Sequence, residues 1–144
     1  MAQDHTHDGM DEGQDHEHDE IQQCIEECLN CHAACTMTAQ YALGEGGDKA
    51  DPGLVGVLLD CAEICQAAVR AMVRGGEMAA AICRACAELC EACAAECEKH
   101  DHEHCKLCAQ MCRECAADCR HAALAVMNHT RIRPAPGVQL RWEF

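Results

Sequence analysis

The stretch CRACAELCEACAAECEKHDHEHCKLCAQMCRECAADC, Cys83–Cys119, decides the fold of this chain. On either side of a short turn at His100 and Asp101, its cysteines recur at steps of three or four residues, the spacing of side chains that share one face of an α-helix. An ordinary helical bundle carries Leu and Ile at these positions, whereas this chain carries thiols. The stretch therefore predicts two antiparallel helices that face each other through cysteine.

The same cysteine spacing continues upstream, in two further helical stretches. Asp19 is a candidate N-cap of the first, and Asp51 followed by Pro52 is a typical start for the second. The connections are short, so neighbouring helices should be antiparallel. The predicted fold class is all-α, an up-down-up-down four-helix bundle with a cysteine-lined core. Its helices are expected over about residues 20–43, 52–74, 77–99 and 102–128.

The cysteines of different helices are also in register. In an antiparallel hairpin, residues at equal height have a constant sum of residue numbers, and the cysteine pairs of neighbouring helices satisfy this rule. The rule predicts layers of thiols stacked along the bundle axis. These are Cys35, Cys61, Cys90 and Cys112, then Cys31, Cys65, Cys86 and Cys115, then Cys28, Cys83 and Cys119 with Ala68. Apolar residues are expected to close the end near Cys24, namely Ile21, Met72, Ala79, Ala122 and Val126.

The opposite end of the bundle is predicted to be an entrance. His100, His102 and His104 lie at the turn above Cys97 and Cys105, so that imidazoles would precede thiols on the way in. Asp60, next to Cys61, is a further candidate ligand, with a carboxylate exposed on the helix as the ordinary alternative. His32 is expected to face solvent.

Composition and charge bound the function. The chain of 144 residues has 25 acidic and 11 basic side chains and a net charge of −14, which argues against nucleic acid and anionic membranes as partners. Residues 1–19 are predicted to be a disordered, acidic, His-rich tail, residues 20–129 the bundle, and residues 130–144 an irregular tail. We find no export signal and no membrane-spanning apolar run, so we expect a cytoplasmic protein whose thiols stay reduced.

Sixteen thiols in one core indicate a soft metal ion, and charge indicates which one. Thiolates favour Cu(I), Zn(II) and iron–sulfur clusters. A buried zinc site with four thiolates keeps a net charge of −2, which is costly in an apolar core, whereas one Cu(I) per thiolate leaves the core neutral. We therefore favour multiple Cu(I) ions, with a zinc-thiolate or general soft-metal buffer as the alternative. The candidate ligands are Cys24, Cys28, Cys31, Cys35, Cys61, Cys65, Cys83, Cys86, Cys90, Cys93, Cys97, Cys105, Cys108, Cys112, Cys115 and Cys119.

Four other interpretations of the chain fit less well: a disulfide scaffold, a copper metallochaperone, a metal-dependent regulator and an enzyme. Thiols at i and i+4 on a helix have parallel side-chain directions, which disfavours disulfides. A copper metallochaperone would need few, exposed ligands and a docking face, and a metal-dependent regulator would need a basic surface. The chain shows no nucleophile–base pair, so we do not expect an enzyme.

The run around the turn, CEACAAECEKHDHEHCKLCAQMC at Cys90–Cys112, resembles the bacterial cytosolic copper storage proteins, a family of cysteine-rich four-helix bundles. The resemblance covers about residues 20–128. It implies a homotetramer of bundles that hold Cu(I) on core thiolates, and a His-bearing mouth that admits the metal. A copper chaperone or a cuproenzyme is a further candidate partner. The resemblance also implies that copper is bound largely by CxxxC pairs, which here are Cys24/Cys28, Cys31/Cys35, Cys61/Cys65, Cys86/Cys90, Cys93/Cys97, Cys108/Cys112 and Cys115/Cys119. Residues 53–59 lack a cysteine that relatives can carry there.

Overall fold

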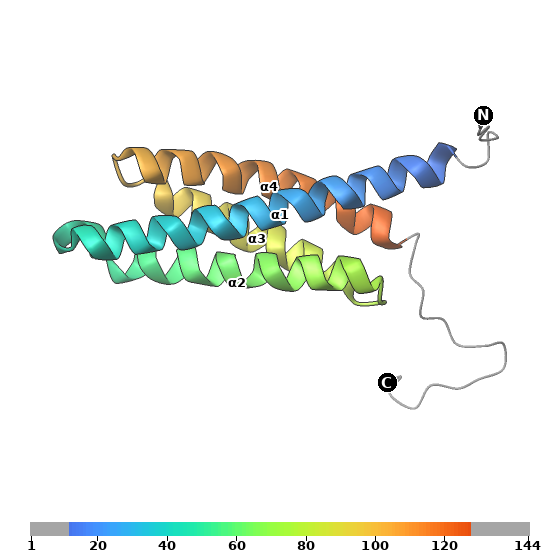
Figure 1. Ribbon diagram of the computed structural model, residues 1–144, viewed down its shortest axis with the longest axis horizontal. Coiled ribbons are helices and arrows are strands. Elements are labelled where there is room, and N and C mark those ends of the chain that lie inside the picture. Colours follow the sequence, from blue (N-terminus) through green and yellow to red (C-terminus); the bar gives the residue numbers. More distant parts are fainter. Residues whose placement is uncertain (1–11, 128–144) are drawn as a thin grey trace, which may run out of the picture.

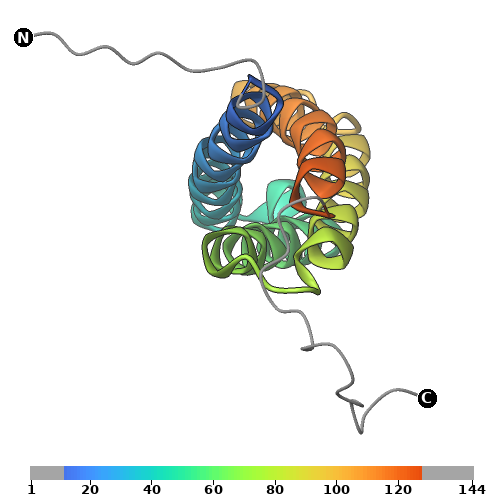
Figure 2. The same cartoon turned by 90° about the vertical axis from the view of Figure 1, so that its right-hand side faces the viewer.

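The computed structural model describes residues 12–127 of the chain. Within this range the chain forms four α-helices and one short 3-10 helix, and consecutive α-helices run antiparallel (Figure 1). Each α-helix packs against two neighbours around a common axis (Figure 2). The predicted all-α four-helix bundle is therefore confirmed. The elements are α1 (Glu12–Glu45), η1 (Gly47–Ala50), α2 (Pro52–Arg74), α3 (Ala79–Cys97) and α4 (Glu103–Met127).

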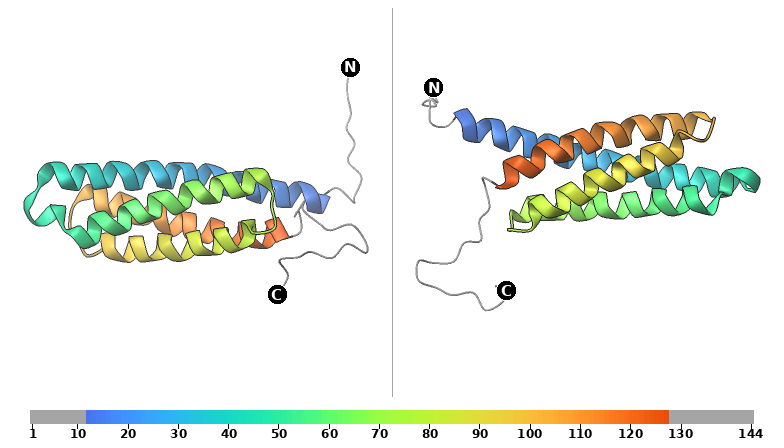
Figure 3. Two further views of the ribbon diagram at one scale, coloured as in Figure 1. Left: turned by 90° about the horizontal axis from the view of Figure 1, so that it is seen from below. Right: turned by 180° about the vertical axis from the view of Figure 1, so that it is seen from behind.

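The two ends of the bundle are built differently. At one end, η1 connects α1 to α2 beside the tight turn between α3 and α4 (Figure 3). At the other end, the α2–α3 turn lies near the last residues of α4, and the beginning of α1 projects past it (Figure 3). The histidine-bearing turn is therefore at the end where α1 finishes and α2 begins.

The second helix begins and ends as its sequence predicts. The Asp51 carboxylate accepts a hydrogen bond from the backbone N–H of Leu54, at 3.0 Å, and Pro52 occupies the first turn. Gly75 ends the helix in the left-handed conformation, with φ 69°, and its N–H reaches the carbonyl of Ala71 at 2.9 Å. These caps fix the height of α2 relative to its neighbours.

The first helix begins earlier than predicted. It starts at Glu12, so the expected start near residue 20 and the N-cap at Asp19 are wrong. The sequence of the added stretch, residues 12–19, is rich in Asp and Glu. Acidic residues are generally favourable in the first turns of a helix because the N-terminal end of the helix dipole is positive. The acidic composition that indicated a disordered tail is therefore also compatible with a helix start. Residues 1–11 and 128–144, which hold the rest of both expected tails, lie outside the described residues.

The core consists mainly of cysteine and alanine. All sixteen cysteines are free thiols, and none is more than 1% exposed. Alanines such as Ala39, Ala68 and Ala94 are equally buried and allow the helices to lie close together. The largest fully buried side chains are Leu54 and Leu58, both near the start of α2. Thiols thus take the place of the aliphatic stripe in an ordinary bundle, because a free cysteine packs as a small apolar side chain.

The second helix is apolar for a structural reason. Among the described helices, α2 is the one long and apolar enough to cross a membrane by length and composition, with a mean hydropathy of 1.4. Its buried face, which includes Leu54, Cys61, Cys65 and Met72, packs into the bundle core. Packing in the core therefore accounts for part of its apolar composition, since 33% of this apolar stretch is buried within the bundle.

Candidate metal centre

The predicted register is confirmed between α2 and α3. The sulfur atoms of Cys61 and Cys90 lie 3.6 Å apart, and those of Cys65 and Cys86 lie 3.8 Å apart. Both pairs belong to layers that the sequence predicts. The stripes of these two helices therefore meet at equal height along the bundle axis.

Contacts between α1 and α4 link the layers to one another. The predicted pairs Cys35–Cys112 and Cys28–Cys119 have their sulfurs 3.7 and 3.6 Å apart. Cys112 also lies 3.7 Å from Cys31, a member of the next layer. The layers are therefore staggered, and a thiol such as Cys112 contacts sulfurs of its own layer and of the next. We call this continuous set of buried thiols the thiol column.

Within the thiol column, sulfurs gather in groups that can hold a metal ion. In each group the ligand atoms lie within 4.8 Å of one another, and all members are buried. The groups overlap, because Cys28, Cys31, Cys35, Cys65, Cys112 and Cys115 each belong to two of them. Four-member groups are Cys28/Cys65/Cys86/Cys115, Cys31/Cys65/Cys90/Cys115, Cys31/Cys35/Cys61/Cys112 and Cys35/Cys93/Cys108/Cys112, and a group of three is Cys24/Cys28/Cys119.

The thiols of one helix also approach each other within CxxxC pairs. The two sulfurs lie 3.9 Å apart in each of four such pairs: Cys24/Cys28, Cys31/Cys35, Cys86/Cys90 and Cys115/Cys119. One turn of helix separates the members of a pair, so their side chains point the same way. Such a pair can hold a single ion between its sulfurs.

Cys83 departs from the predicted pattern. It is fully buried at the level of the third layer, yet it forms no thiol–thiol hydrogen bond with any described residue. Burial raises the pKa of the Cys83 thiol to about 12, and the negative charge of a neighbouring Cys28 thiolate adds to the effect. At neutral pH this sulfur keeps its proton until a cation replaces it.

Elsewhere in the column, hydrogen bonds between thiols set the protonation state. Hydrogen bonds from Cys115 and Cys119 lower the pKa of Cys28, because they stabilise a thiolate there. The hydrogen bonds of Cys115 with Cys119 and Cys28 raise the pKa of Cys115 itself. A first thiolate among these sulfurs therefore makes a second one beside it harder to form, and a bound cation would offset the negative charge.

One of the three predicted entrance histidines touches the thiols. The His102 Nε2 atom lies 3.2 Å from the Cys105 sulfur. Its other ring nitrogen, Nδ1, is buried and has no hydrogen-bond partner among residues 12–127. Partial burial lowers the pKa of His102, and the positive charge of Lys49 lowers it further. A neutral imidazole with a free nitrogen beside a thiol is a suitable first ligand for a soft cation.

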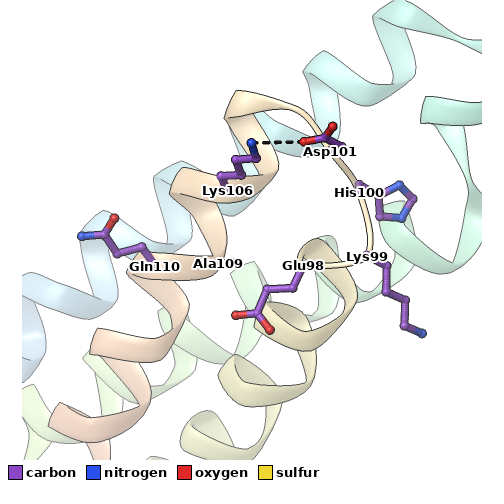
Figure 4. Close-up of a pocket in the computed structure, with 7 residues that line it drawn as sticks. All are labelled: Glu98, Lys99, His100, Asp101, Lys106, Ala109 and Gln110. Carbon is purple, nitrogen blue, oxygen red and sulfur yellow. Dashed lines mark ion pairs between the residues drawn. The ribbon is translucent and has the colours of Figure 1, made fainter.

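The other two histidines flank His102 without reaching a thiol in the described contacts. The rings of His100 and His104 each lie 6.5 Å from the His102 ring, centre to centre. The His100 Nε2 atom lies 3.9 Å from a carboxylate oxygen of Glu96. Figure 4 shows His100 on the opposite side of the turn from the ion pair between Asp101 and Lys106.

Tyr41, which the sequence analysis missed, completes the entrance. Its ring stacks on His104 with centres 3.9 Å apart and planes 12° apart, and its centre lies 5.3 Å from that of His102. Tyr41 follows the buried Thr38 by one turn of α1. This spacing is the one signal in the sequence that places it at the mouth.

The remaining predictions have mixed outcomes. The closed end is confirmed, since Met72, Ala79, Ala122 and Val126 are buried there. Asp60 is exposed on α2, and the five thiol groups named for the column do not include it. The expectation that His32 faces solvent is wrong. Its Nδ1 atom lies 2.9 Å from the Ala62 carbonyl oxygen, so the ring bridges α1 and α2 at the outside of the bundle.

Fold and site together define a class of protein: a four-helix bundle with a column of buried thiols from all four helices, which could hold metal ions, and three histidines at one end. The chain belongs to the copper storage protein family, whose family model matches residues 17–124.

Comparisons with individual proteins agree with this assignment. The chain is 41% identical to the uncharacterized cysteine-rich protein YhjQ of Bacillus subtilis over 81 residues, which is 56% of this chain and 75% of that protein. Among solved structures, the Cu(I)-bound copper storage protein BsCsp3 from Bacillus subtilis superposes with a TM-score of 0.70 at 40% identity, covering 72% of this chain and 98% of that one. A cytosolic copper storage protein from Streptomyces lividans, solved with five coppers, gives a TM-score of 0.67 at 32% identity, covering 75% of this chain and 95% of that one.

Proposed function

We propose that the protein stores Cu(I) in the cytoplasm, binding about one ion per cysteine on its sixteen core thiols. The observation that carries this proposal is the overlap of the thiol groups. Neighbouring groups share Cys31, Cys35, Cys65 and Cys115, so the groups cannot all be filled as separate four-thiolate sites. They can be filled together only if sulfurs bridge adjacent ions, and bridging suits a monovalent ion that accepts two or three ligands.

Charge supports the same choice of metal. Each Cu(I) that replaces one thiol proton leaves the net charge of the column unchanged. A divalent ion on four thiolates would leave two negative charges, for which residues 12–127 place no cationic partner in the core. The pKa of Cys83, about 12, fits this exchange because a proton stays on the sulfur until the metal arrives. A zinc-thiolate or general soft-metal buffer is the second candidate. It is favoured only because several groups contain four sulfurs, the number of ligands that zinc usually takes.

We propose that copper enters at the mouth through His102. The ion would bind the His102 ring and pass to Cys105, whose sulfur lies 3.2 Å from Nε2. From there it would enter the thiol column, where sulfurs such as those of Cys108 and Cys35 lie less than 4 Å apart. In each transfer the copper–sulfur bond behind the ion breaks as the next one forms, and the proton of the receiving thiol passes to the thiolate left behind. Each Cu(I) that is stored therefore releases one thiol proton to solvent in total, without a change in oxidation state. Loading should therefore weaken as the pH falls.

Replacing His102 by alanine should slow the early phase of loading by about fivefold, which corresponds to about 1 kcal/mol on the barrier. The final copper content should fall by no more than one ion, because the thiol column is intact. Stopped-flow transfer from a coloured Cu(I) chelate measures the rate, and the absorbance at saturation measures the content. His121→Ala, which replaces an exposed histidine of α4 away from the mouth, is the control. An unchanged rate would exclude His102 from the route.

The most direct test of which metal is stored is to identify the metal that the protein binds in cells. Protein purified anaerobically after growth in medium supplemented with both copper and zinc should contain many copper ions per chain and little zinc. Emission spectrometry of the purified protein measures both. Zinc in excess of copper would favour the general buffer instead.

The store needs partners for exchange, and we propose a copper chaperone or a cuproenzyme for this role. We do not expect catalysis, since filled thiolate sites offer no open position for a substrate. A tetramer is our expectation for its assembly. Exposed apolar side chains on the outer faces, such as Val73 and Leu124 at 67% each, are available for contacts between chains.

A further inference from the structure

We propose that a groove between α1 and α4 is a second Cu(I) site, a lateral port whose thioethers and imidazole deliver the ion directly to Cys108. This inference rests on the proposed copper-storing function and adds to it a route separate from the axial mouth. The groove lies on the flank of the bundle, with a volume of about 350 Å³. The residues on which the argument depends are Met37 and Thr38 of α1 and His104, Leu107, Cys108 and Met111 of α4.

The groove combines soft ligands from two helices. On α4, His104, Cys108 and Met111 are spaced by four and three residues, so they share one helix face. Met37 of α1 lines the same groove. Thioether sulfur and imidazole nitrogen are both ligands that favour Cu(I). Both are neutral, so they hold the ion more weakly than a thiolate and can release it.

Exposure decreases along the groove from solvent to core. Met37 is 66% exposed and His104 is also exposed, whereas Met111 is half-buried and Cys108 is only 1% exposed. A methionine that fills a gap in a core would be covered, so packing does not account for Met37. These side chains instead form a path from solvent to core. Along this path the ligands change from thioether and imidazole to thiolate, which binds Cu(I) more strongly, and exposure to water falls.

The path reaches the thiol column at Cys108, beside a cysteine that two metal-holding groups share. The Cys108 sulfur lies 3.7 Å from that of Cys35, which belongs to two of the metal-holding groups. Near the mouth, α2 contributes Leu54 and Leu58 to the core in place of thiols, so an ion entering axially finds few sulfurs on that side. An ion from the groove bypasses this apolar wall.

The transfer step balances without a further reactant. Cu(I) leaves the two thioethers and the imidazole and forms a bond to the Cys108 sulfur. The Cys108 thiol gives up its proton, which passes to water or to the freed His104 ring. Copper stays monovalent: metal–ligand bonds are exchanged, the S–H bond breaks, and one O–H or N–H bond forms where the proton is taken up.

The test is the double variant Met37→Leu/Met111→Leu made in the His102→Ala background, where the axial route is already impaired. Leucine keeps the volume and apolar character of methionine, so the bundle should fold unchanged. We expect the remaining rate of Cu(I) uptake from a coloured chelate to fall by at least about tenfold. The final copper content should stay the same. The matched control is Met78→Leu/Met127→Leu, which replaces exposed methionines away from the groove, 66% and 55% exposed.

Direct binding supplies the second readout. In the wild-type protein with methyl-13C methionine and a thiol column already saturated with copper, one further equivalent of Cu(I) should shift the Met37 and Met111 methyl signals but not that of Met78. Uptake equal to that of the control variant, or unshifted groove methyls, would overturn the proposal. A change of oligomeric state with unshifted methyls would assign the groove to a second copy of the chain. A full copper content in every variant would leave the storage function standing, whereas saturation near four equivalents would contradict that function itself.

Discussion

Replacing Cys31, Cys35, Cys61 and Cys112 by alanine is expected to divide the copper store in two. These four sulfurs form one of the central groups, and their removal separates the cysteines near the mouth from those near the closed end. The content should fall by about four ions. More importantly, the cysteines beyond the gap should fill at least about tenfold more slowly, since even 1.4 kcal/mol added to the transfer barrier has that effect. Time-resolved uptake from a Cu(I) chelate should become clearly biphasic.

The matched control removes thiols without interrupting the column. Replacing Cys24, Cys28 and Cys119 by alanine takes away the group at the closed end. This variant should lose about three ions and fill the rest at the wild-type rate. Equal kinetics in the two variants would mean that copper does not travel from sulfur to sulfur along the axis.

The second large effect expected is a loss of stability of the copper-free protein in alkali. The pKa of Cys83 rises from 9.0 to about 12 on folding, because its thiol is buried. A raised pKa means that the folded state holds the proton more tightly, so the stabilisation is complete below pH 9 and disappears as the pH rises towards 12. At pH 10.5, Cys83 alone should cost on the order of 2 kcal/mol.

Urea unfolding followed by circular dichroism, without oxygen, measures this effect at pH 7, 9 and 10.5. The urea concentration at half-unfolding should fall steeply above pH 9 in the copper-free protein, and less steeply in the copper-free Cys83→Ala variant. In the copper-loaded protein this urea concentration should hardly change with pH, because the thiols have already exchanged their protons for copper. A flat midpoint in the copper-free protein between pH 8 and 10.5 would contradict the assignment of a protonated apolar thiol core.

The register of the thiol layers could be predicted from the sequence because only two features determine it, the helical periodicity of the cysteines and the length of the connections. Helical periodicity puts each run of cysteines on one face, and short connections leave little freedom in the relative height of neighbouring helices. Cys61–Cys90 and Cys65–Cys86 meet as predicted for this reason. The stagger that links Cys31 to Cys112 could not be read, because a constant-sum rule assumes helices that face each other at equal height and ignores the depth at which each sulfur lies.

The features that escaped prediction lack a periodic signal. Tyr41 is a single aromatic residue, and its stacking on His104 depends on how α1 and α4 approach each other at the mouth. His32 reaches the Ala62 carbonyl because α2 passes beside it, which no local pattern reveals. The start of α1 at Glu12 was hidden by composition, since an acidic run is equally typical of a solvated tail and of a helix beginning.

The central claim is that Cu(I) neutralises the thiol column at about one ion per sulfur. Anaerobic titration of the reduced protein with Cu(I), in competition with a coloured cuprous chelator, tests it most directly. The account predicts that the chelator stays copper-free until about sixteen equivalents have been added, one for each cysteine. Saturation near four equivalents would contradict it, because the thiols would then act as isolated four-ligand sites.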